Sequence, residues 1–589
     1  MTSARTPLLV GARHSGESDR SDDLAEAEDA ALHTSTRRTE GQWPPRGAAS
    51  TSGRLRELLL FAWALLATAA AIILVVWTRH QQQTTPRSAQ PALLAGKRNL
   101  IFMVSDGMGP ASLSLTRSFR QLTEGVPIND TLALDRHFWG TSRTRSSNSL
   151  VTDSAAGATA FSCGKKSYNG AISILPDLTP CGTVLEAAKR AGYHTGLVVT
   201  TDITDATPAC FASHVNVRTQ MDEIALQEIG EGPLGHVVDL MLGGGRCHFL
   251  PNTSQGSCRQ DNIDVTSIAE LNGWHYVDDR AGFDSLETGN SVSLPVLGLF
   301  ASADIPFEID RRNMADTYPS LSEMAATALR ALEKATEDSE KGFFLMIEGS
   351  RIDHAGHIND PAAQVREVME FDKTFRLVLD FLEQSDTEGI VVSTSDHETG
   401  GLSTALQEPG HLPIYNWYPT ALDKAKVSSE HLSLLLREHV LSIAADGSVE
   451  DVQSLKNWIN MELLIPHLGI TDALDEELEL LASNPETSII IFAELVSLRA
   501  HIGWSTHGHS AVDVNIYSSG GPVVEGLRGN VENTDVGKFL REYLDVDVEK
   551  ITQELNSKLG VDQSSASKTS TAEDLDFPWS FCGLPPNAC

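Results

Sequence analysis

Short apolar runs that are rich in β-branched residues recur along this chain and constrain its fold most strongly. Four of them have the length and the continuous hydrophobicity of strands that are buried on both faces of a sheet. Helical patterns alternate with these runs, for example at residues 321–334 and 362–382. Such alternation predicts an α/β fold with a doubly wound, mostly parallel central sheet flanked by helices. The four runs are residues 99–105, 194–200, 343–347 and 390–394.

An uncharged segment near the N-terminus predicts a membrane anchor. Residues 58–77 carry no charge and have the length that an α-helix needs to cross a bilayer. Arginines are more frequent before this segment than after it, so the positive-inside tendency places the N-terminus in the cytosol and the rest of the chain in the lumen. We therefore expect a single-pass type II membrane protein. Two glycosylation sequons, at Asn129 and Asn252, fit the lumenal side.

Changes in composition predict the remaining domain boundaries. Residues 1–57 lack apolar periodicity and are typical of a disordered cytosolic tail, and residues 78–96 form a polar stalk. The main folded domain is expected at 97–561, with a largely helical insertion at 398–500. Residues 562–589 are rich in Ser and Thr and then contain prolines, which predicts a flexible tail.

The charge balance argues against a nucleic-acid-binding protein. The chain has 79 Asp and Glu against 45 Lys and Arg, a formal net charge of -34, whereas phosphate backbones are held by clustered basic residues. A protein this acidic that acts on small phosphate anions must concentrate positive charge locally. Bound metal ions are one way to do so.

Seven cysteines in 589 residues do not form a dense disulfide framework. Cys247 and Cys258 lie close together in a Gly-rich, polar stretch, and a second close pair lies at the C-terminus, so each pair could form a local disulfide in an oxidising compartment. The others could be free or buried thiols, and the odd total leaves at least one cysteine without a partner in the chain. The C-terminal pair is Cys582 and Cys589, and the others are Cys163, Cys181 and Cys210.

Two short motifs hold candidate catalytic residues. Asp106 follows the first apolar run in MVSDGMG, where it could serve chemistry or only cap a helix. Ser154 lies in VTDSAAGAT, ahead of small residues that could open a helix. Backbone N–H groups at a helix start favour an anion, so Ser154 could be a nucleophile within a phosphate site. The alternative is an ordinary capping serine.

Carboxylates and imidazoles cluster after the third and fourth runs. The block EGSRIDHAGH begins at Glu348, and its Asp353 and His357 are four residues apart, which places them on one face of a helical turn. Asp396 and His397 follow the next run. These groups are costly to bury unless they bind metal or each other, although a solvated acidic loop is the alternative. Mixed oxygen and nitrogen ligands suit Zn²⁺, and oxygen-only ligands suit Mg²⁺, so we expect more than one metal ion.

Taken together and in this order, these motifs resemble the alkaline phosphatase family. The resemblance covers about residues 99–517, interrupted by the helical insertion, and the anchored architecture resembles that of the vacuolar members of fungi. It implies hydrolysis of a broad range of phosphate monoesters to an alcohol and inorganic phosphate, through a phosphoserine intermediate and with an alkaline pH optimum. It also implies two Zn²⁺ and one Mg²⁺ per chain, a homodimer and a location in the vacuolar membrane.

The resemblance also implies a role for each matching residue. Ser154 matches the nucleophile, and Arg218, in FASHVNVR, matches the arginine that clamps two phosphate oxygens. His507 is preferred over His509 as a ligand because of its distance to the VDV segment that follows. Three further residues, Asp205, His354 and His214, are expected beside the ligands. The first zinc site matches Asp353, His357 and His507, the second matches Asp106, Asp396 and His397, and the magnesium site matches Asp106, Thr207 and Glu348.

Two other functions have to be weighed. A related hydrolase with a similar two-metal site, such as a phosphodiesterase, a sulfatase or a cofactor-independent phosphoglycerate mutase, would share most of the ligands. A non-catalytic membrane receptor could retain the fold alone. The Arg218 segment and VTDSAAGAT favour a monoesterase.

Overall fold

The computed structural model describes residues 58–70, 96–407, 409–445 and 451–560. The chain divides into two units, residues 1–89 and 90–589. The described part of the first unit is a helix over residues 58–70. Within the described ranges, none of the helices is both long and apolar enough to cross a bilayer. Residues 71–77 of the expected span lie outside those ranges, as do the tail at 1–57, nearly all of the stalk and the C-terminal tail.

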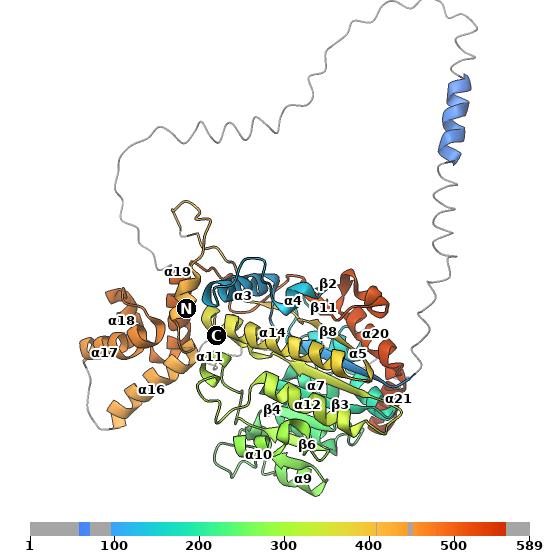
Figure 1. Ribbon diagram of the computed structural model, residues 1–589, viewed down its shortest axis with the longest axis horizontal. Helices are drawn as coiled ribbons and strands as arrows, with labels where there is room; N and C mark the ends of the chain where they lie inside the picture. Colours follow the sequence, from blue (N-terminus) through green and yellow to red (C-terminus); the bar gives the residue numbers. More distant parts are fainter. Residues whose placement is uncertain (1–57, 71–95, 408, 446–450, 561–589) are drawn as a thin grey trace, which may run out of the picture. The chain divides into compact units, whose positions relative to one another are not determined.

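A large mixed sheet forms the centre of the second unit (Figure 1). In the described part of the chain it has ten strands, in the order β12-β2-β11-β8-β1-β7-β3-β4-β6-β5. β11 runs antiparallel to its neighbours β2 and β8, and every other pair is parallel. The mostly parallel sheet is therefore confirmed. Its strands are β1 (Arg98–Val104), β2 (Phe138–Arg143), β3 (His194–Asp202), β4 (Leu240–Gly244), β5 (His275–Val277), β6 (Val296–Leu299), β7 (Phe343–Glu348), β8 (Glu388–Thr394), β11 (Val514–Ser518) and β12 (Gly529–Glu532); β9 (Glu398–Thr399) and β10 (His509–Ser510) pair separately.

Helices cover both faces of the sheet, and polar residues set where several of them begin. For example, Ser320 and Glu323 form a capping box at the start of α12. The helices are α3 (Pro110–Thr123), α4 (Ala133–Arg136), α5 (Ser154–Cys163), α6 (Val184–Arg190), α7 (Ala206–Ala212), α8 (Met221–Leu226), α9 (Val265–Leu271), α10 (Arg280–Ser285), α11 (Glu308–Arg311), α12 (Leu321–Ala335), α13 (Arg351–His357), α14 (Pro361–Gln384), α15 (Pro419–Lys424), α16 (Ser429–Ala445), α17 (Val452–Trp458), α18 (Asp475–Ser483), α19 (Ser488–Ala500), α20 (Asn533–Leu544) and α21 (Val548–Leu559).

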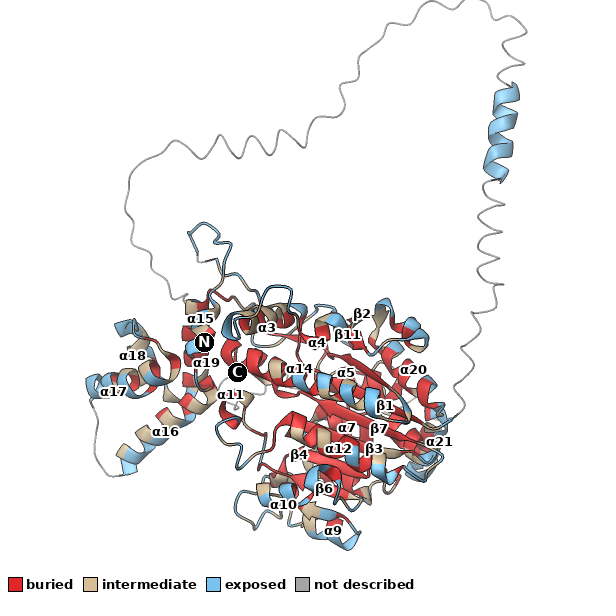
Figure 2. Cartoon of the chain, viewed as in Figure 1, coloured by how far each residue is buried: buried red, intermediate tan, exposed pale blue. Residues whose placement is uncertain are grey.

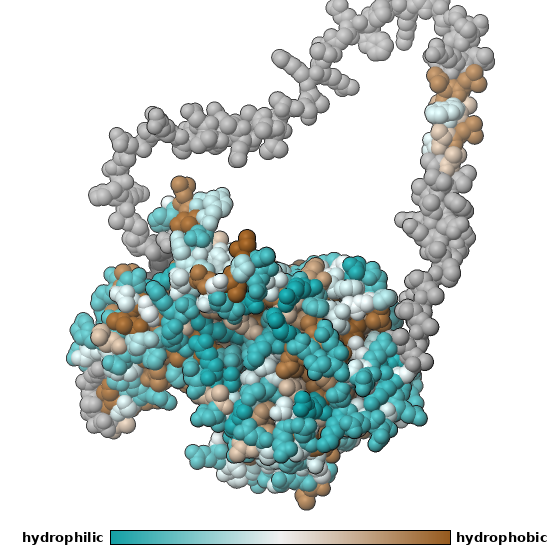
Figure 3. Space-filling view, in the orientation of Figure 1, coloured by the Kyte–Doolittle hydropathy of each residue, from teal (hydrophilic) through white to brown (hydrophobic). Residues whose placement is uncertain are grey.

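The inner strands have continuous apolar stretches because both of their faces are covered. In β1, Leu100 and Phe102 join the hydrophobic cluster on one face, whereas Ile101 and Met103 join the cluster on the other. Figure 2 shows the strands buried between the helix layers. The surface of the domain in Figure 3 is mostly hydrophilic. Because successive side chains of β1 point to two faces that are both buried, the strand has no polar–apolar alternation in the sequence.

The stretch between β9 and β10 holds helices α15 to α19, which build a hydrophobic cluster of their own with parts of α3 and α14. They form the orange lobe in Figure 1. We refer to residues 400–508 as the helical insertion. Because β9 and β10 pair with each other, the insertion leaves and rejoins the domain at adjacent points.

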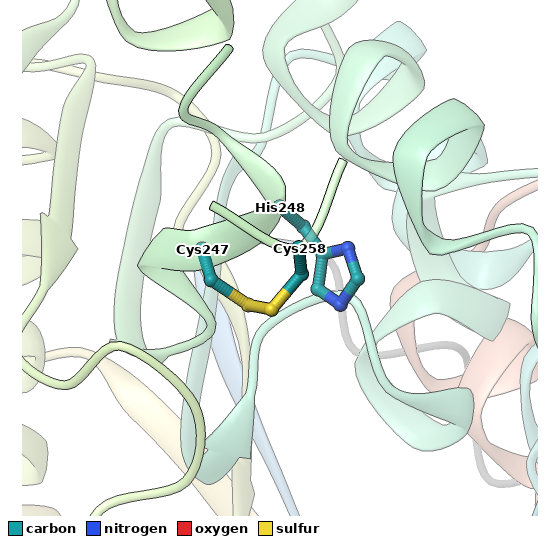
Figure 4. A group of neighbouring side chains, drawn as sticks. All are labelled: Cys247, His248 and Cys258. Atoms are coloured by element: carbon teal, nitrogen blue, oxygen red, sulfur yellow. A yellow bond between two sulfur atoms is a disulfide. The ribbon is translucent and has the colours of Figure 1, made fainter. Parts of the chain in front are cut away.

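Two disulfides occur among the described cysteines. Cys247 pairs with Cys258, as the sequence suggested, and Cys163 pairs with Cys181. His248 lies beside the Cys247–Cys258 bond (Figure 4), but sulfurs joined in a disulfide offer no thiolate to a metal ion. Cys210 is free and buried. Cys582 and Cys589 lie outside the described residues.

Replacing both Cys163 and Cys181 by Ala is expected to lower the free energy of unfolding. The bond closes a loop with a sequence separation of 18 residues, for which the loss is about 3 kcal/mol. Chemical denaturation of the variant and the wild type under non-reducing conditions measures the difference. Unchanged unfolding would show that this bond adds no stability.

Candidate active site

The candidate residues converge because parallel strands end at the same edge of the sheet. Val104, the last residue of β1, lies opposite Glu348 of β7 on one side and Thr394 of β8 on the other. Asp106 and Asp396 each follow two residues after these strand ends. Polar residues at the carboxyl edge of an α/β sheet are in the position where ligands bind.

Ser154 is the first residue of α5 and is buried against this edge. Its Oγ lies 3.1 Å from Nε2 of His397, and Asp153 caps the helix by accepting a hydrogen bond from the N–H of Ala156. The small residues of VTDSAAGAT allow the helix to approach closely. A Cβ at Gly157 would lie 2.8 Å from the Cβ of Asp396, so a larger residue there would push the helix away.

Three imidazole rings turn their Nε2 atoms toward the centre of the site. Nδ1 of His357 donates to the carbonyl oxygen of His507, and Nδ1 of His509 donates to that of Thr152. Nδ1 of His397 donates to Oγ1 of Thr399, a hydroxyl that itself donates to Asp353. Since these bonds occupy the Nδ1 protons, each neutral ring presents a lone pair on Nε2.

These lone pairs lie unusually close together. The Nε2 atoms of His357 and His509 are 3.1 Å apart, and with both Nδ1 protons on backbone carbonyl oxygens, two neutral rings face each other with lone pairs. Burial and the neighbouring His397 lower the pKa of His509 well below its ordinary value, which keeps its ring neutral. Two facing lone pairs repel unless a cation lies between them and accepts both. The orientation of the rings therefore fits a metal ion.

The carboxylates give independent support for bound cations. Burial raises the pKa of Asp106 well above its ordinary value, and Asp396 and Asp353 raise it further. Burial raises the pKa of Glu348 to about 8. Such crowding of buried acids is costly unless cations compensate it. Among the expected metal ligands, three buried oxygen atoms make no hydrogen bond: Asp106 Oδ1, Asp396 Oδ2 and Thr207 Oγ1.

Two groups of potential ligand atoms emerge from this geometry. The ligand atoms of Asp353, His397 and His509 lie within 4.8 Å of one another, as do those of Asp106, Asp396 and His397. His357 joins the first group, because its Nε2 lies 3.3 Å from Oδ2 of Asp353. The residues present therefore fit more than one metal ion beside a serine hydroxyl.

Arg218 lies in the same cavity as Ser154. The cavity has a volume of about 260 Å³ and is also lined by His354, His357 and His509. The Arg218 guanidinium lies 2.8 Å from Asp205 and 3.6 Å from Asp153. Burial by itself would lower the pKa of Arg218, but these carboxylates raise it above its ordinary value. A permanent, fixed cation here can bind the oxygens of a phosphate group.

Comparison with known proteins decides what this site is. The family model for alkaline phosphatase matches residues 97–546. The chain belongs to the alkaline phosphatase family. It is 54% identical over 475 residues to the repressible alkaline phosphatase of Saccharomyces cerevisiae, covering 77% of this chain and 83% of that protein. It is 46% identical to the alkaline phosphatase of Schizosaccharomyces pombe, with the same coverage of the two chains.

Solved alkaline phosphatases share the fold. The enzyme of Thermus thermophilus aligns with a TM-score of 0.63 at 28% identity, over 80% of this chain and 97% of that one. The enzyme of Shewanella sp. aligns with a TM-score of 0.61 at 30% identity, over 76% and 99%. The chain is therefore an alkaline phosphatase that hydrolyses phosphate monoesters in a metal-dependent reaction. The family match selects this function over the related hydrolases and the receptor.

One histidine of this alkaline phosphatase lies elsewhere than the sequence suggested. His507 is exposed, and its Nδ1 donates to the carbonyl oxygen of His357. His509 instead stacks on His397, with ring centroids 3.4 Å apart, and its Nε2 points to His357. The reason is the strand pairing, which sets His509 opposite Thr399, two residues after His397. The geometry thus favours His509 as the ligand and corrects the preference for His507.

The residues expected beside the ligands divide into two groups. Asp205 binds Arg218, and His354 lines the cavity with its Nδ1 3.1 Å from Asp304. His214 lies outside the cavity, because its ring is held by Glu186 at 2.8 Å and by a backbone carbonyl. Nothing in the local sequence separates these cases.

Three contributors to the alkaline phosphatase site were missed in the sequence. Thr399 links Asp353 to His397, Asp153 pairs with Arg218, and Asp304 holds His354. Asp153 had a signal, because an Asp directly before a helix of small residues is a typical cap. Thr399 and Asp304 had none.

Proposed function

We propose that this alkaline phosphatase works with two Zn²⁺ and one Mg²⁺ per chain and with Ser154 as its nucleophile. The observation that carries the proposal is the set of inward-facing imidazole lone pairs beside the Ser154 hydroxyl. When bound, such ions make hydroxyl and water more acidic and stabilise the oxygen of the departing alcohol. The first zinc site would comprise Asp353, His357 and His509, the second Asp106, Asp396 and His397, and the magnesium site Asp106, Thr207 and Glu348.

Ser154 supplies the nucleophile of the reaction, and Arg218 binds the phosphate group. The deprotonated Oγ of Ser154 attacks phosphorus in line with the ester bond, so that a bond to Oγ forms while the bond to the alcohol oxygen breaks. Arg218 binds two phosphate oxygens, and Asp153 and Asp205 hold its guanidinium. Water then attacks the phosphoserine, releases inorganic phosphate and restores the hydroxyl. Two displacements retain configuration at phosphorus.

Replacing His509 by Ala is expected to lower both zinc content and activity. The loss of zinc affinity should exceed about 100-fold, because even residues outside the ligand shell cost 10- to 100-fold. His507→Ala is the matched control and should stay within about threefold of the wild type, since His507 is exposed and the substitution keeps its carbonyl oxygen, which accepts from Nδ1 of His357. Metal analysis of both purified variants and assays on a nitrophenyl phosphate measure the effects. The reverse ranking would restore His507 as the ligand.

Metal analysis of the purified wild type tests the stoichiometry itself. We expect two zinc ions and one magnesium ion per chain. A preparation that is fully active with a single type of ion would contradict the assignment.

Comparing rates on a nitrophenyl monoester and the corresponding diester tests the preference for monoesters. Ser154 and Arg218 line the same cavity, so recognition is centred on the phosphate group, which supports a broad range of substrates.

We also propose that residues 58–77 anchor the enzyme as a single-pass type II protein in the vacuolar membrane, with its catalytic domain lumenal. The uncharged segment and the arginines before it support this. Asn129 and Asn252 of the two sequons are exposed, which suits glycosylation. Carbonate extraction of membranes would test the anchor. A mobility shift that Asn→Gln variants of the two sequons abolish would test glycosylation. Light scattering of the lumenal domain would test the expected homodimer.

A further inference from the structure

Arg351 begins the helix that carries two of the proposed zinc ligands. It is the first residue of α13, and Asp353 and His357 follow on the same helix. Its side chain is only 4% exposed. The guanidinium lies 3.7 Å from the centroid of the Phe307 ring and donates to the carbonyl oxygen of Ile305. A buried cation at this position must be paired, and its partners fix where the helix starts.

The main ionic partner of Arg351 comes from the helical insertion. Nη2 donates to Oε2 of Glu430 at 2.7 Å, and Glu430 is the second residue of α16. In the described part of the chain, Asp304 is the other carboxylate within ion-pair distance, at 3.7 Å. Asp304 also lies 3.1 Å from Nδ1 of His354, which lines the active-site cavity. A chain of polar contacts thus runs from Glu430 through Arg351 and Asp304 to His354.

A second set of contacts fixes the start of α16 against the same corner of the domain. Oδ2 of Asp360 accepts hydrogen bonds from both the N–H and the hydroxyl of Ser429, each at 2.8 Å. The other oxygen, Oδ1, accepts from the N–H groups of Ala362 and Ala363 at the start of α14. Glu430, the next residue after Ser429, is therefore presented to Arg351 from a fixed base.

We propose that Glu430 is a positioning residue through which the helical insertion holds the metal-binding helix α13 and His354 in place. Without its charge, Arg351 keeps Asp304 as its remaining carboxylate partner and draws it away from His354. The first turn of α13 then shifts, and Asp353 shifts with it. The inference rests on the proposed assignment of Asp353 and His357 as zinc ligands.

The test compares how firmly full-length holoenzyme variants hold zinc. Glu430→Gln keeps the shape of the side chain and removes its charge. We expect it to weaken zinc retention by about tenfold, the lower end of the range for residues that orient ligands. Transfer of zinc to a chromophoric chelator measures the effect. Glu477→Gln is the matched control, because Glu477 pairs with Arg499 at 2.8 Å inside the insertion and away from α13. This control should retain zinc as the wild type does.

Thermal unfolding of the metal-free proteins separates positioning from general destabilisation. Metal-free Glu430→Gln should unfold within a few degrees of the metal-free control, since the Glu430 side chain is 35% exposed. Unchanged zinc retention in Glu430→Gln would overturn the proposal, and so would equal losses in both variants. A wild type that retains no zinc would instead overturn the ligand assignment on which the inference rests.

Discussion

Replacing Ser154 by Ala is expected to lower kcat for a nitrophenyl phosphate by at least about 10³-fold, because the variant has no oxygen to attack phosphorus. Phosphoenzyme trapped by acid quenching should disappear with the activity. Zinc content should remain close to that of the wild type, since imidazoles and carboxylates provide the proposed zinc ligands. Steady-state assays, acid trapping and metal analysis together measure these three outcomes.

A serine in the same helix provides the control. Ser162 is buried in α5, but its Oγ contacts Ser173 and lies away from the catalytic cavity. Ser162→Ala should retain phosphoenzyme formation and most of the activity. If Ser154→Ala turned over substrate at the wild-type rate, the assignment of the nucleophile would be wrong.

Removing the metal ions is expected to abolish activity and to destabilise the fold. Chelation leaves Asp106, Asp353 and Asp396 close together in a buried site without compensating charge, and buried like charges repel. Activity should fall by at least about 10³-fold, since both the nucleophile and the leaving group lose their stabilisation. Dialysis against a chelator, followed by addition of Zn²⁺ and Mg²⁺ separately and together, measures the loss and its recovery. Persistent activity in metal-free protein would contradict the proposed site.

The stability of the metal-free protein should also depend on pH in a defined direction. Burial raises the pKa of Glu348 to about 8, from an ordinary value of 4.5. The folded state therefore holds a proton that the unfolded chain releases, and the free energy of unfolding falls as pH rises between these two values. The slope from this group is at most about 1.4 kcal/mol per pH unit. Denaturation of metal-free protein at several pH values between 5 and 8 checks the sign, and stability that rose with pH would contradict it.

Local patterns were sufficient to predict the strands and the residues that end them. The expected strand at 99–105 corresponds to β1 (Arg98–Val104), and the expected helix at 362–382 corresponds to α14 (Pro361–Gln384). Hydrophobicity and chain direction are properties of consecutive residues, so they can be determined from the sequence without knowledge of the tertiary structure. Because parallel strands end at one edge, the convergence of Asp106, Glu348 and Asp396 also followed from the sequence.

Pairings between distant segments could not be predicted in the same way. WSTHGHS offers two histidines two residues apart, and local chemistry does not distinguish them. The choice is made by the pairing of β9 with β10, which sets His509 opposite Thr399 across 110 residues of sequence. The sequence also left open the pairing of Cys163 with Cys181, because it did not distinguish a disulfide from free thiols.

The sequence by itself therefore determined the α/β fold and, through the resemblance of its motifs to a known family, the reaction. Most of the proposed site residues also came from these short motifs at strand ends. The tertiary structure alone decided which histidine faces the proposed metal site, which hydroxyl links Asp353 to His397, and that Glu430 of the insertion reaches Arg351. These contacts join segments that are far apart in the chain. Their geometry depends on how the whole domain packs, and no local pattern encodes it.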